Sequence, residues 1–483
     1  MTAASDETAG VMAMGTGVPG LGRIARAWGS LGELKRKSMS GAALTFSNHF
    51  ANQAMRLASN LLLTRLLFPE AFGVMVLVQL LMQGLAMFSD IGLGPAVVQS
   101  KRGEEPAFLD TVFTVQLIRG VMLWGVACAC AWPMAWWYQS PELAWVIPVA
   151  GFTAVIQGMR SPALLTAQRQ LNLAKLTRLD LYATALGIGA MVAWATVSPT
   201  VWALVAGGWT TAIVRTAASH FWLSDRMSRL RIEREAAGWI YKFVRWITMS
   251  TAFTFLAMQG DKLILAPLID RGGSEAMEGE GVSYLAFYQL AIVLAVMPTE
   301  IVGKVATSVM FPAYAELSRK DPKRIGPALH RFRWMVVPVV WVGMLALAVG
   351  ARPLIGLMYD ERYQDAGWML ELLAVGGMFV LLRSTYNGTF IPLGKVSWML
   401  WMTIVDSALR LGLPIAGFYL GGPEGFVAGV VAAMALGYAV MATSMAVLGV
   451  WQRWLDALFL TLSFAAYAAA IYGLPAMLWA QVG

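Results

Sequence analysis

The chain has few of the residues from which soluble enzymes and metal centres are built. Only 13% of its 483 residues are charged, and it contains two cysteines and three histidines. Cys128 and Cys130 lie two residues apart in one apolar run and cannot form a useful disulfide, and the spacing of the histidines indicates no metal site. Because 58% of the residues are hydrophobic, water-facing side chains are too few to cover the apolar surface, so lipid must cover it.

Long hydrophobic runs are plentiful instead. About 20 apolar residues span a bilayer core of roughly 30 Å, and runs near this length predict thirteen transmembrane helices. They lie near residues 42–64, 72–97, 112–137, 143–166, 180–197, 200–222, 243–269, 284–312, 334–357, 367–391, 397–420, 424–450 and 456–480. We predict an all-α, polytopic membrane protein with an N-lobe of six helices (41–222), a cytoplasmic linker (223–242), a C-lobe of six helices (243–450) and an extra C-terminal helix (451–483).

The positions of Lys and Arg predict the orientation. Residues 1–40 lack the apolar core of a signal peptide. They repeat large apolar residues at helical spacing among basic ones, as in an amphipathic helix on the cytoplasmic leaflet; a disordered basic tail fits equally well. With this segment inside, 24 basic residues fall on the cytoplasmic side and four on the other. We therefore expect a multi-pass protein of the bacterial inner membrane with a cytoplasmic N-terminus, whose net charge of +8 requires no nucleic-acid partner.

Some charged residues fall inside the predicted helices, where each costs about 2.5–3.5 kcal/mol if it faces lipid. The eight basic ones are Arg56, Arg119, Arg160, Arg215, Lys262, Lys304, Arg383 and Arg410, and the four acids are Asp90, Asp261, Glu300 and Asp406. Spacings of four residues allow Glu300 to pair with Lys304, and likewise Asp406 with Arg410. Arg160 and Arg215 could reach a membrane interface. The surplus of four positive charges predicts a hydrated interior or partner groups.

One face of the first predicted helix is polar through most of the membrane. At about 100° per residue, seven polar side chains fall on one arc and apolar side chains on the opposite arc. The seven are Asn48, His49, Asn52, Gln53, Arg56, Ser59 and Asn60. We predict that this helix lines a hydrated cavity; in the alternative, its amides bind neighbouring helices. A weak match between residues 61–67 and 263–269 favours a duplication of the two lobes.

Several short motifs, taken in order, resemble a known family. Residues 65–73 read Arg-Leu-Leu-Phe-Pro-Glu-Ala-Phe-Gly, and residues 88–94 read Phe-Ser-Asp-Ile-Gly-Leu-Gly. Further matches are Gln-Arg-Gln-Leu-Asn at 168–172, Asp-Lys at 261–262 and Phe-Pro-Ala-Tyr at 311–314. Together they resemble the polysaccharide transporters, the Wzx-type oligosaccharide flippases of the multidrug/oligosaccharidyl-lipid/polysaccharide (MOP) exporter superfamily. Two features depart from the family pattern: Phe68, where the family often has glycine, and the thirteenth helix.

The resemblance implies two six-helix bundles around a central V-shaped cavity that opens to each side of the membrane in turn. It implies that a polyprenyl-pyrophosphate-linked oligosaccharide, a precursor of an exopolysaccharide, O-antigen or other polysaccharide, crosses the inner membrane. An anionic head group also suits a surplus of arginine, which binds phosphate bidentately. The residues expected to contact the substrate are Arg56, Lys262, Arg119, Lys304, Asn52, Gln53 and Asn60. Asp90, Asp261 and Glu300 are candidates for coupling to an H+ or Na+ gradient, unless they only balance nearby arginines.

The expected partners are the lipid-linked substrate, the lipid bilayer and the polysaccharide polymerase or export machinery, and we expect a monomer that needs no cofactor and is not an enzyme. Three alternatives remain open: a lipid II flippase, a drug or cation antiporter of the same superfamily, and a membrane polysaccharide polymerase. A positive interior disfavours cationic substrates. A polymerase needs acid–base groups, usually on a sizeable external loop, and the longest predicted external loop, 270–283, is short.

Overall fold

The computed structural model describes residues 51–89, 97, 105–169, 173–223, 229–231, 233, 247–272, 277, 279–321 and 324–465. These residues form helices and connecting turns, and no β strand is assigned to any of them. The predicted N-terminal segment, Asn48, His49, Asp90 and the end of the thirteenth span lie outside the described residues. Seven helices in the described ranges are long and apolar enough to cross a membrane, which agrees with the predicted all-α membrane protein.

The helices follow one another in two groups, for which we keep the names N-lobe and C-lobe. The N-lobe holds helix 51–66, α4 (Pro69–Phe88), α6 (Pro106–Trp137), α7 (Leu143–Gly151), α8 (Thr153–Gly158), α9 (Ala163–Arg169), α10 (Leu173–Val197) and α11 (Val201–Phe221). The C-lobe holds α13 (Ile247–Gly272), α14 (Gly281–Val305), η2 (Ala306–Met310), α15 (Phe311–Lys320), α16 (Ile325–Val349), α17 (Ala351–Met358), η4 (Glu361–Tyr363), α18 (Asp365–Ser384) and α19 (Val396–Val447), followed by helix 453–465.

The predicted span 143–166 is not one continuous helix. The structure divides it into α7, α8 and α9, and the clearest break lies between α8 and α9. Pro162 has no N–H to donate and disfavours a helical conformation at Ser161. The main-chain N–H of Ser161 instead donates to the hydroxyl of Ser219 on α11, 2.9 Å away, so the break is fixed by a neighbouring helix.

Helix α19 contains two predicted spans, 397–420 and 424–450, folded into a hairpin. Gly421 and Gly422 interrupt the helical conformation, and Gly422 has a φ of 61°, which favours glycine. The two arms then cross at main-chain distance, because a Cβ atom added to Gly425 would lie 2.0 Å from the carbonyl oxygen of Gly417. Glycine at both positions therefore permits the close crossing that small residues allow in membrane helices.

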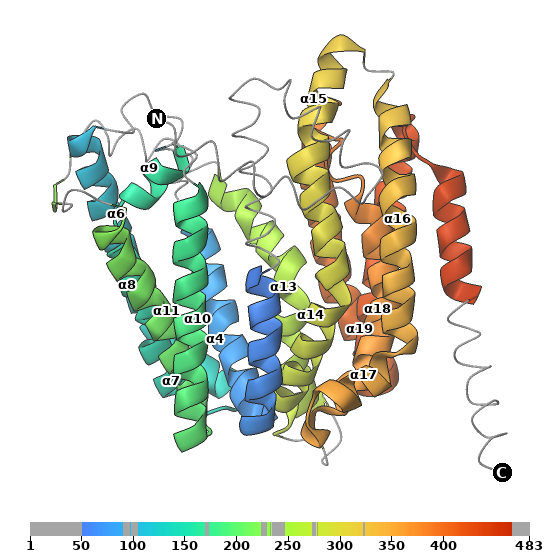
Figure 1. Ribbon diagram of the computed structural model, residues 1–483. Coiled ribbons are helices and arrows are strands. Elements are labelled where there is room, and N and C mark those ends of the chain that lie inside the picture. The colour runs from blue at the N-terminus through green and yellow to red at the C-terminus, as the bar shows by residue number, and fades with distance from the viewer. Residues whose placement is uncertain are drawn as a thin grey trace, which may run out of the picture.

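The two lobes pack on each other at the end of the molecule where α4 begins and α13 ends, which we call the closed end (the lower end in Figure 1). Gly73 of α4 lies against the main chain of Val282 of α14, where an added Cβ would be 2.0 Å from the carbonyl oxygen. Toward the opposite end, the ribbons of α8 and α9 diverge from those of α15 and α16, giving a V-shaped arrangement (Figure 1).

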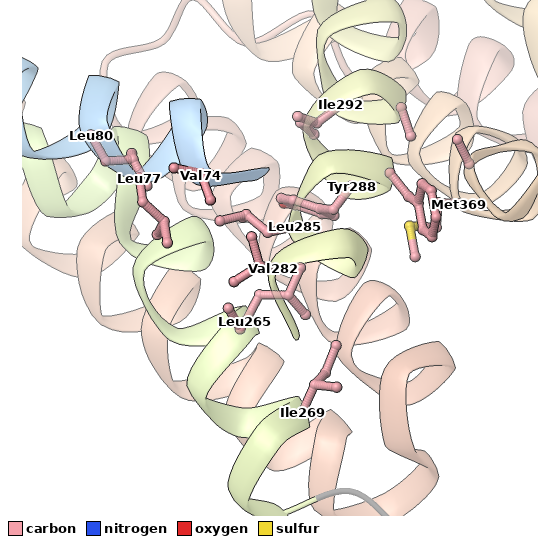
Figure 2. Packing of buried hydrophobic residues seen from close by; sticks show 14 of the residues in the cluster. Val74, Leu77, Leu80, Leu265, Ile269, Val282, Leu285, Tyr288, Ile292 and Met369 are labelled. Carbon is pink, nitrogen blue, oxygen red and sulfur yellow. The ribbon is translucent and has the colours of Figure 1, made fainter. Parts of the chain in front are cut away.

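A large hydrophobic cluster at the closed end joins both lobes. It contains buried side chains of α4 in the N-lobe and of α13, α14 and α18 in the C-lobe, and Figure 2 shows some of them interdigitating: Val74, Leu77, Leu80, Leu265, Ile269, Val282, Leu285, Tyr288, Ile292 and Met369. Because dispersion contacts stabilise any membrane-embedded interface without help from water, this cluster holds the lobes together in the conformation seen.

A short turn of the C-lobe also binds the end of helix 51–66 through hydrogen bonds. The Tyr363 hydroxyl donates to the carbonyl oxygen of Leu67 at 3.2 Å, and its ring meets the rings of Phe72 and Phe287 edge-on at 6.0 Å. The neighbouring Arg362 donates to the carbonyl oxygen of Arg65 at 3.3 Å. We call Arg362 and Tyr363 the latch; together they satisfy carbonyl groups that a helix C-terminus leaves unpaired.

The linker between the lobes docks on the start of α6. The main-chain N–H groups of Arg229 and Arg231 donate to Asp110 at 3.0 Å and Thr114 at 2.9 Å. Both acceptors are buried, and these bonds explain why polar side chains are tolerated there. The described part of the linker is thus attached to the N-lobe at the end away from the latch.

Candidate substrate site

The first helix presents its polar face much as the sequence predicts. Arg56 and Asn60 are exposed, and Gln53 is partly exposed. Within the described part of the chain, the Arg56 guanidinium makes no hydrogen bond or ion pair. An exposed, unpaired arginine inside a membrane span is tolerated when it faces water or a polar ligand rather than lipid.

Two residues of this face serve packing instead. Ser59 is buried, and Asn52 accepts a hydrogen bond from the Thr184 hydroxyl of α10 at 3.1 Å. These contacts match the alternative interpretation, in which polar residues bind neighbouring helices. The face is therefore divided: Asn52 and Ser59 hold the helix in place, and Arg56 and Asn60 are left exposed.

Asp261 and Lys262 on α13 point in different directions. Asp261 is buried and accepts a hydrogen bond from the Tyr288 hydroxyl of α14, while its other carboxylate oxygen has no partner among the described residues. Lys262 is partly exposed and lies within electrostatic range of Asp261, Glu300 and Arg410. The structure thus brings two predicted coupling residues close to one predicted substrate residue.

Glu300 and Lys304 lie one turn apart on α14. Glu300 is exposed, Lys304 is partly exposed, and the charge of Glu300 acts on Lys304. The structure thus places Lys262, Glu300 and Lys304 within electrostatic range of one another in the C-lobe through Glu300. Among the described residues, no contact joins Arg56 in the N-lobe to Lys262.

Arg119 ties two helices together. Its guanidinium, on α6, donates to the Ser89 hydroxyl at 3.0 Å and to the Ala86 carbonyl oxygen at 2.9 Å, both at the end of α4. These bonds complete the C-terminus of α4, whose last carbonyl groups have no partners within the helix. A role for Arg119 in substrate binding remains a prediction, and it would compete with this packing role.

Two arginines of the C-lobe share one carboxylate. Asp406 of α19 accepts from Arg383 of α18 at 2.5 Å and from Arg410 at 3.3 Å, which confirms the predicted pair of Asp406 and Arg410. The site is tightly filled, because a Cβ added to Gly437 would lie 2.8 Å from both Arg383 Nη1 and Asp406 Oδ1. We call Arg383, Asp406 and Arg410 the C-lobe triad.

The N-lobe has a comparable group that the sequence interpretation missed. Arg215 of α11 pairs with Asp180 of α10 at 3.0 Å, and Arg160, at the end of α8, is within electrostatic range of both. We call these three residues the N-lobe triad. From the sequence, we expect Arg160 and Arg215 to reach a membrane interface. The acids that we count inside predicted helices do not include Asp180.

Arg333 is one of the 24 basic residues that the predicted topology places on the cytoplasmic side. It lies in α16 with its side chain 0% exposed and is paired with Asp456 of helix 453–465. Asp456 also accepts from Tyr386 at 2.9 Å and Trp451 at 3.0 Å.

The fold and motifs lead to one family. A family model described as "Polysaccharide biosynthesis protein" matches residues 62–367. The chain belongs to this family. The lipopolysaccharide biosynthesis protein WzxC of Escherichia coli (strain K12) is 22% identical to this chain over 366 residues, which cover 75% of this chain and 70% of WzxC.

Solved structures share the fold. The lipid II flippase MurJ in an inward closed conformation superposes with a TM-score of 0.65 at 11% identity, covering 90% of this chain and 93% of MurJ. An inward-facing multidrug resistance MATE family transporter of the MOP superfamily gives a TM-score of 0.59 at 15% identity, covering 87% and 96%. The predicted family is confirmed by the family model, and the chain has the fold of solved transporters of the MOP superfamily.

Proposed function

We propose that this transporter moves a polyprenyl-pyrophosphate-linked oligosaccharide from the cytoplasmic to the periplasmic leaflet by alternating access. The observation that carries the proposal is the guanidinium of Arg56, which is exposed on the polar face of helix 51–66 and has no hydrogen bond or ion pair among the described residues. A pyrophosphate group supplies the anionic oxygens that such a guanidinium binds, often in a bidentate manner. The lipid tail can stay in the bilayer while only the head group enters the hydrated region.

Lys262 and Lys304 provide the matching positive groups in the C-lobe. Both are partly exposed, and Glu300 lies close enough to act on each electrostatically. A substrate phosphate that approaches Lys262 or Lys304 replaces the charge of Glu300 as their counter-ion. Asn60 and Gln53 add amide groups that can donate to sugar hydroxyls or phosphate oxygens.

The closed end then corresponds to the periplasmic side, because the excess of Lys and Arg lies at the opposite side of the predicted topology. Transport requires the large apolar cluster and the latch at the closed end to separate, and the diverging ends of the lobes to approach. The conformation described here is thus the one that receives substrate from the cytoplasm.

Asp261 is the strongest candidate for coupling to an ion gradient. It is buried, and one of its oxygens is unpartnered among the described residues, which makes the carboxylate a place for a proton or Na+ to neutralise. Replacing Asp261 with Asn keeps its shape and removes the charge. We expect Asp261→Asn to abolish gradient-driven transport and to leave substrate binding in place.

The decisive experiment is a flipping assay in proteoliposomes with a fluorescent polyprenyl-pyrophosphate glycan. Wild type should expose the glycan to an external quencher, and Arg56→Ala should slow this at least tenfold, the loss expected for one charge-assisted contact of about 1.5–3 kcal/mol. Arg178→Ala is the matched control, since Arg178 is an exposed arginine at the start of α10. Equal rates for wild type and Arg56→Ala would reject the assigned role of Arg56.

A genetic test separates the alternatives. Deletion of the gene should strand the lipid-linked glycan in the cytoplasmic leaflet, whereas loss of a polymerase would change the chain length of the exported polymer. A drug antiporter would leave the glycan unaffected and alter resistance to cationic compounds. A lipid II flippase would be required for growth rather than for polysaccharide export.

A further inference from the structure

The N-lobe triad differs from an ordinary ion pair because it holds two guanidinium groups and one carboxylate. Arg215 contacts Asp180 through Nη2 at 3.0 Å. The Arg160 side chain has no hydrogen bond or ion pair within the described part of the chain, and its Nε atom is buried without a partner, as is that of Arg215. The triad therefore keeps one uncompensated positive charge and several unused N–H donors.

Arg160 is held rigidly beside Arg215. Three side chains of α11 bind the main chain on both sides of Arg160: Thr216 donates to Ile156 at 2.9 Å, His220 contacts Met159 at 2.8 Å, and Ser219 accepts from Ser161 at 2.9 Å. These three contacts hold the main chain on both sides of Arg160 against α11. They fix the backbone of Arg160 at a position where its side chain lies within electrostatic range of both Arg215 and Asp180.

The ion pair of the N-lobe triad is more exposed than the side chains of the C-lobe triad. The side chains of Arg215 and Asp180 are 29% and 40% exposed, whereas Asp406 is 10% exposed and contacts both of its arginines directly. Those two arginine side chains are only 20% and 18% exposed, so a ligand has little access to them. In the N-lobe, the Arg215 guanidinium contacts Asp180 at 3.0 Å, and that of Arg160 has no hydrogen bond or ion pair among the residues that the structure describes.

The depth of the triad indicates which ligand reaches it. Arg215 lies six residues before the end of α11 at Phe221, about 9 Å along the helix. Next to this end, the exposed rings of Tyr182 and Trp222 meet edge-on at 6.0 Å, and amphipathic aromatic residues are enriched at the level of lipid head groups. The triad thus lies just inside the interface, within reach of a phosphate at the membrane surface.

We propose that Arg160 and Arg215 form a binding site for the phosphate group of a lipid, with Asp180 as an internal competitor that the phosphate displaces from Arg215. Two lipids offer this chemistry: the pyrophosphate-linked substrate, for which the site is the first contact before the helix that carries Arg56, and an anionic phospholipid of the bilayer. The first of these sources rests on the proposed function; the phosphate site itself does not.

The test is lipid binding to the full-length protein in phosphatidylcholine nanodiscs, followed by native mass spectrometry. One arm adds geranylgeranyl pyrophosphate and the other adds phosphatidylglycerol. Arg160→Gln and Arg215→Gln should each weaken binding at least tenfold in the arm that supplies the ligand. Arg178→Gln, an exposed arginine on α10 near the triad, should leave binding unchanged.

Asp180→Asn distinguishes a ligand site from a structural ion pair. Because it removes the competing carboxylate, it should strengthen phosphate binding about threefold or more, whereas loss of a merely structural pair would weaken binding together with thermal stability. Arg160→Lys and Arg215→Lys retain the charge without the bidentate geometry. They should bind at an intermediate level, which keeps the test valid if a Gln variant fails to fold.

Each outcome has a defined meaning. If only the pyrophosphate arm depends on the two arginines, the site receives substrate; if only the phosphatidylglycerol arm does, it is a phospholipid site. Binding that is the same in wild type and in the Arg160→Gln/Arg215→Gln double variant, or weaker in Asp180→Asn, overturns the proposal. Neither result bears on flipping by wild type or on Arg56→Ala, so the proposed function stands or falls separately.

Discussion

The two lobes contain the same combination of two arginines and one aspartate, yet they use it differently. In the C-lobe triad, both guanidinium groups contact Asp406, and Gly437 leaves just enough room for them. In the N-lobe triad, Arg160 is unpaired among the described residues and Asp180 is 40% exposed. The difference shows that an intramembrane arginine is not a functional residue by its type alone. Its role depends on whether the protein supplies enough acceptors.

The first way to test this comparison is to remove the acceptor from a fully buried arginine, Arg333. Asp456→Ala leaves Arg333 buried without its counter-ion, and breaking a buried pair in this way costs about 3–5 kcal/mol. Thermal unfolding in detergent should show a large decrease in stability. Arg331→Ala removes an exposed arginine two residues away and should change little.

Replacing both partners provides the complementary measurement. Arg333→Met combined with Asp456→Leu removes both charges, and such replacements are often neutral or stabilising. The double variant should recover most of the stability lost in Asp456→Ala. If Asp456→Ala unfolds like wild type, the buried pair is not what attaches helix 453–465 to the C-lobe.

A second test adds a methyl group beside the C-lobe triad instead of removing a charged group. Gly437→Ala places a methyl group 2.8 Å from Arg383 and Asp406, and such overpacking typically costs about 1–3 kcal/mol. Gly412→Ala on the same helix is the control, because a Cβ there meets nothing within 4 Å. Thermal unfolding should separate the two variants, and equal melting would show that the triad adjusts without strain.

A third test concerns the contacts between the lobes. Tyr363→Phe keeps the edge-on ring contacts and removes the hydrogen bond to the carbonyl oxygen of Leu67, which is worth about 1 kcal/mol. This should shift the equilibrium toward separation of the closed end about fivefold. Spin labels at Val197 and Leu357, both highly exposed, would report the change as a larger population at long distance.

The control for this measurement lies four residues earlier. The Tyr359 hydroxyl makes no hydrogen bond in the described ranges, so Tyr359→Phe should leave the distance distribution unchanged. A distribution unchanged in Tyr363→Phe as well would assign the closed end to the apolar cluster alone.

The smallest effect is expected from pH. Hydrogen bonds from the side chain and the main chain of Arg362 hold the pKa of Asp360 below its ordinary value. A carboxyl group whose pKa is lowered in the folded state contributes its stabilisation above the unfolded pKa and loses it as the pH falls through the folded pKa. The spin-label distances should therefore be constant from neutral pH to about pH 5 and lengthen only at more acidic pH.

Asp360→Asn tests that assignment. It should abolish this acid-dependent lengthening, because no carboxyl group remains to be protonated. If the lengthening persists in Asp360→Asn, another acid controls the latch.

Hydropathy and motif order predicted most of the fold, because lipid imposes long apolar helices and because glycine and proline mark the turns. The turn before Pro69 and the hairpin at Gly422 lie where the sequence places helix boundaries. The break at Pro162 was missed because residues 143–166 have the length and the high apolar content of a single membrane span. Only the contact between Ser161 and Ser219, far apart in the sequence, shows that the helix ends there.

The candidate site was less predictable, because pairing depends on distances between helices. Asp406 and Arg410 were paired correctly since both lie on one helix. Arg333 and Asp456 are separated by more than a hundred residues and lie near helix ends, where charges usually meet water. The hydropathy of the sequence does not indicate that these two charged side chains are buried together. A search for acids in helices that neighbour an arginine-bearing helix would have included Asp180.

The π-helical turn η2 solves a problem of angular register in the long helix that runs from α14 into α15. In a regular α-helix, Tyr314 would be rotated about 120° from Val302, yet both side chains are almost completely buried. A π turn holds one extra residue, which reduces the offset to about 20°. A single added residue thus keeps one continuous stripe of this helix facing inward as it passes from one hydrophobic cluster to the next.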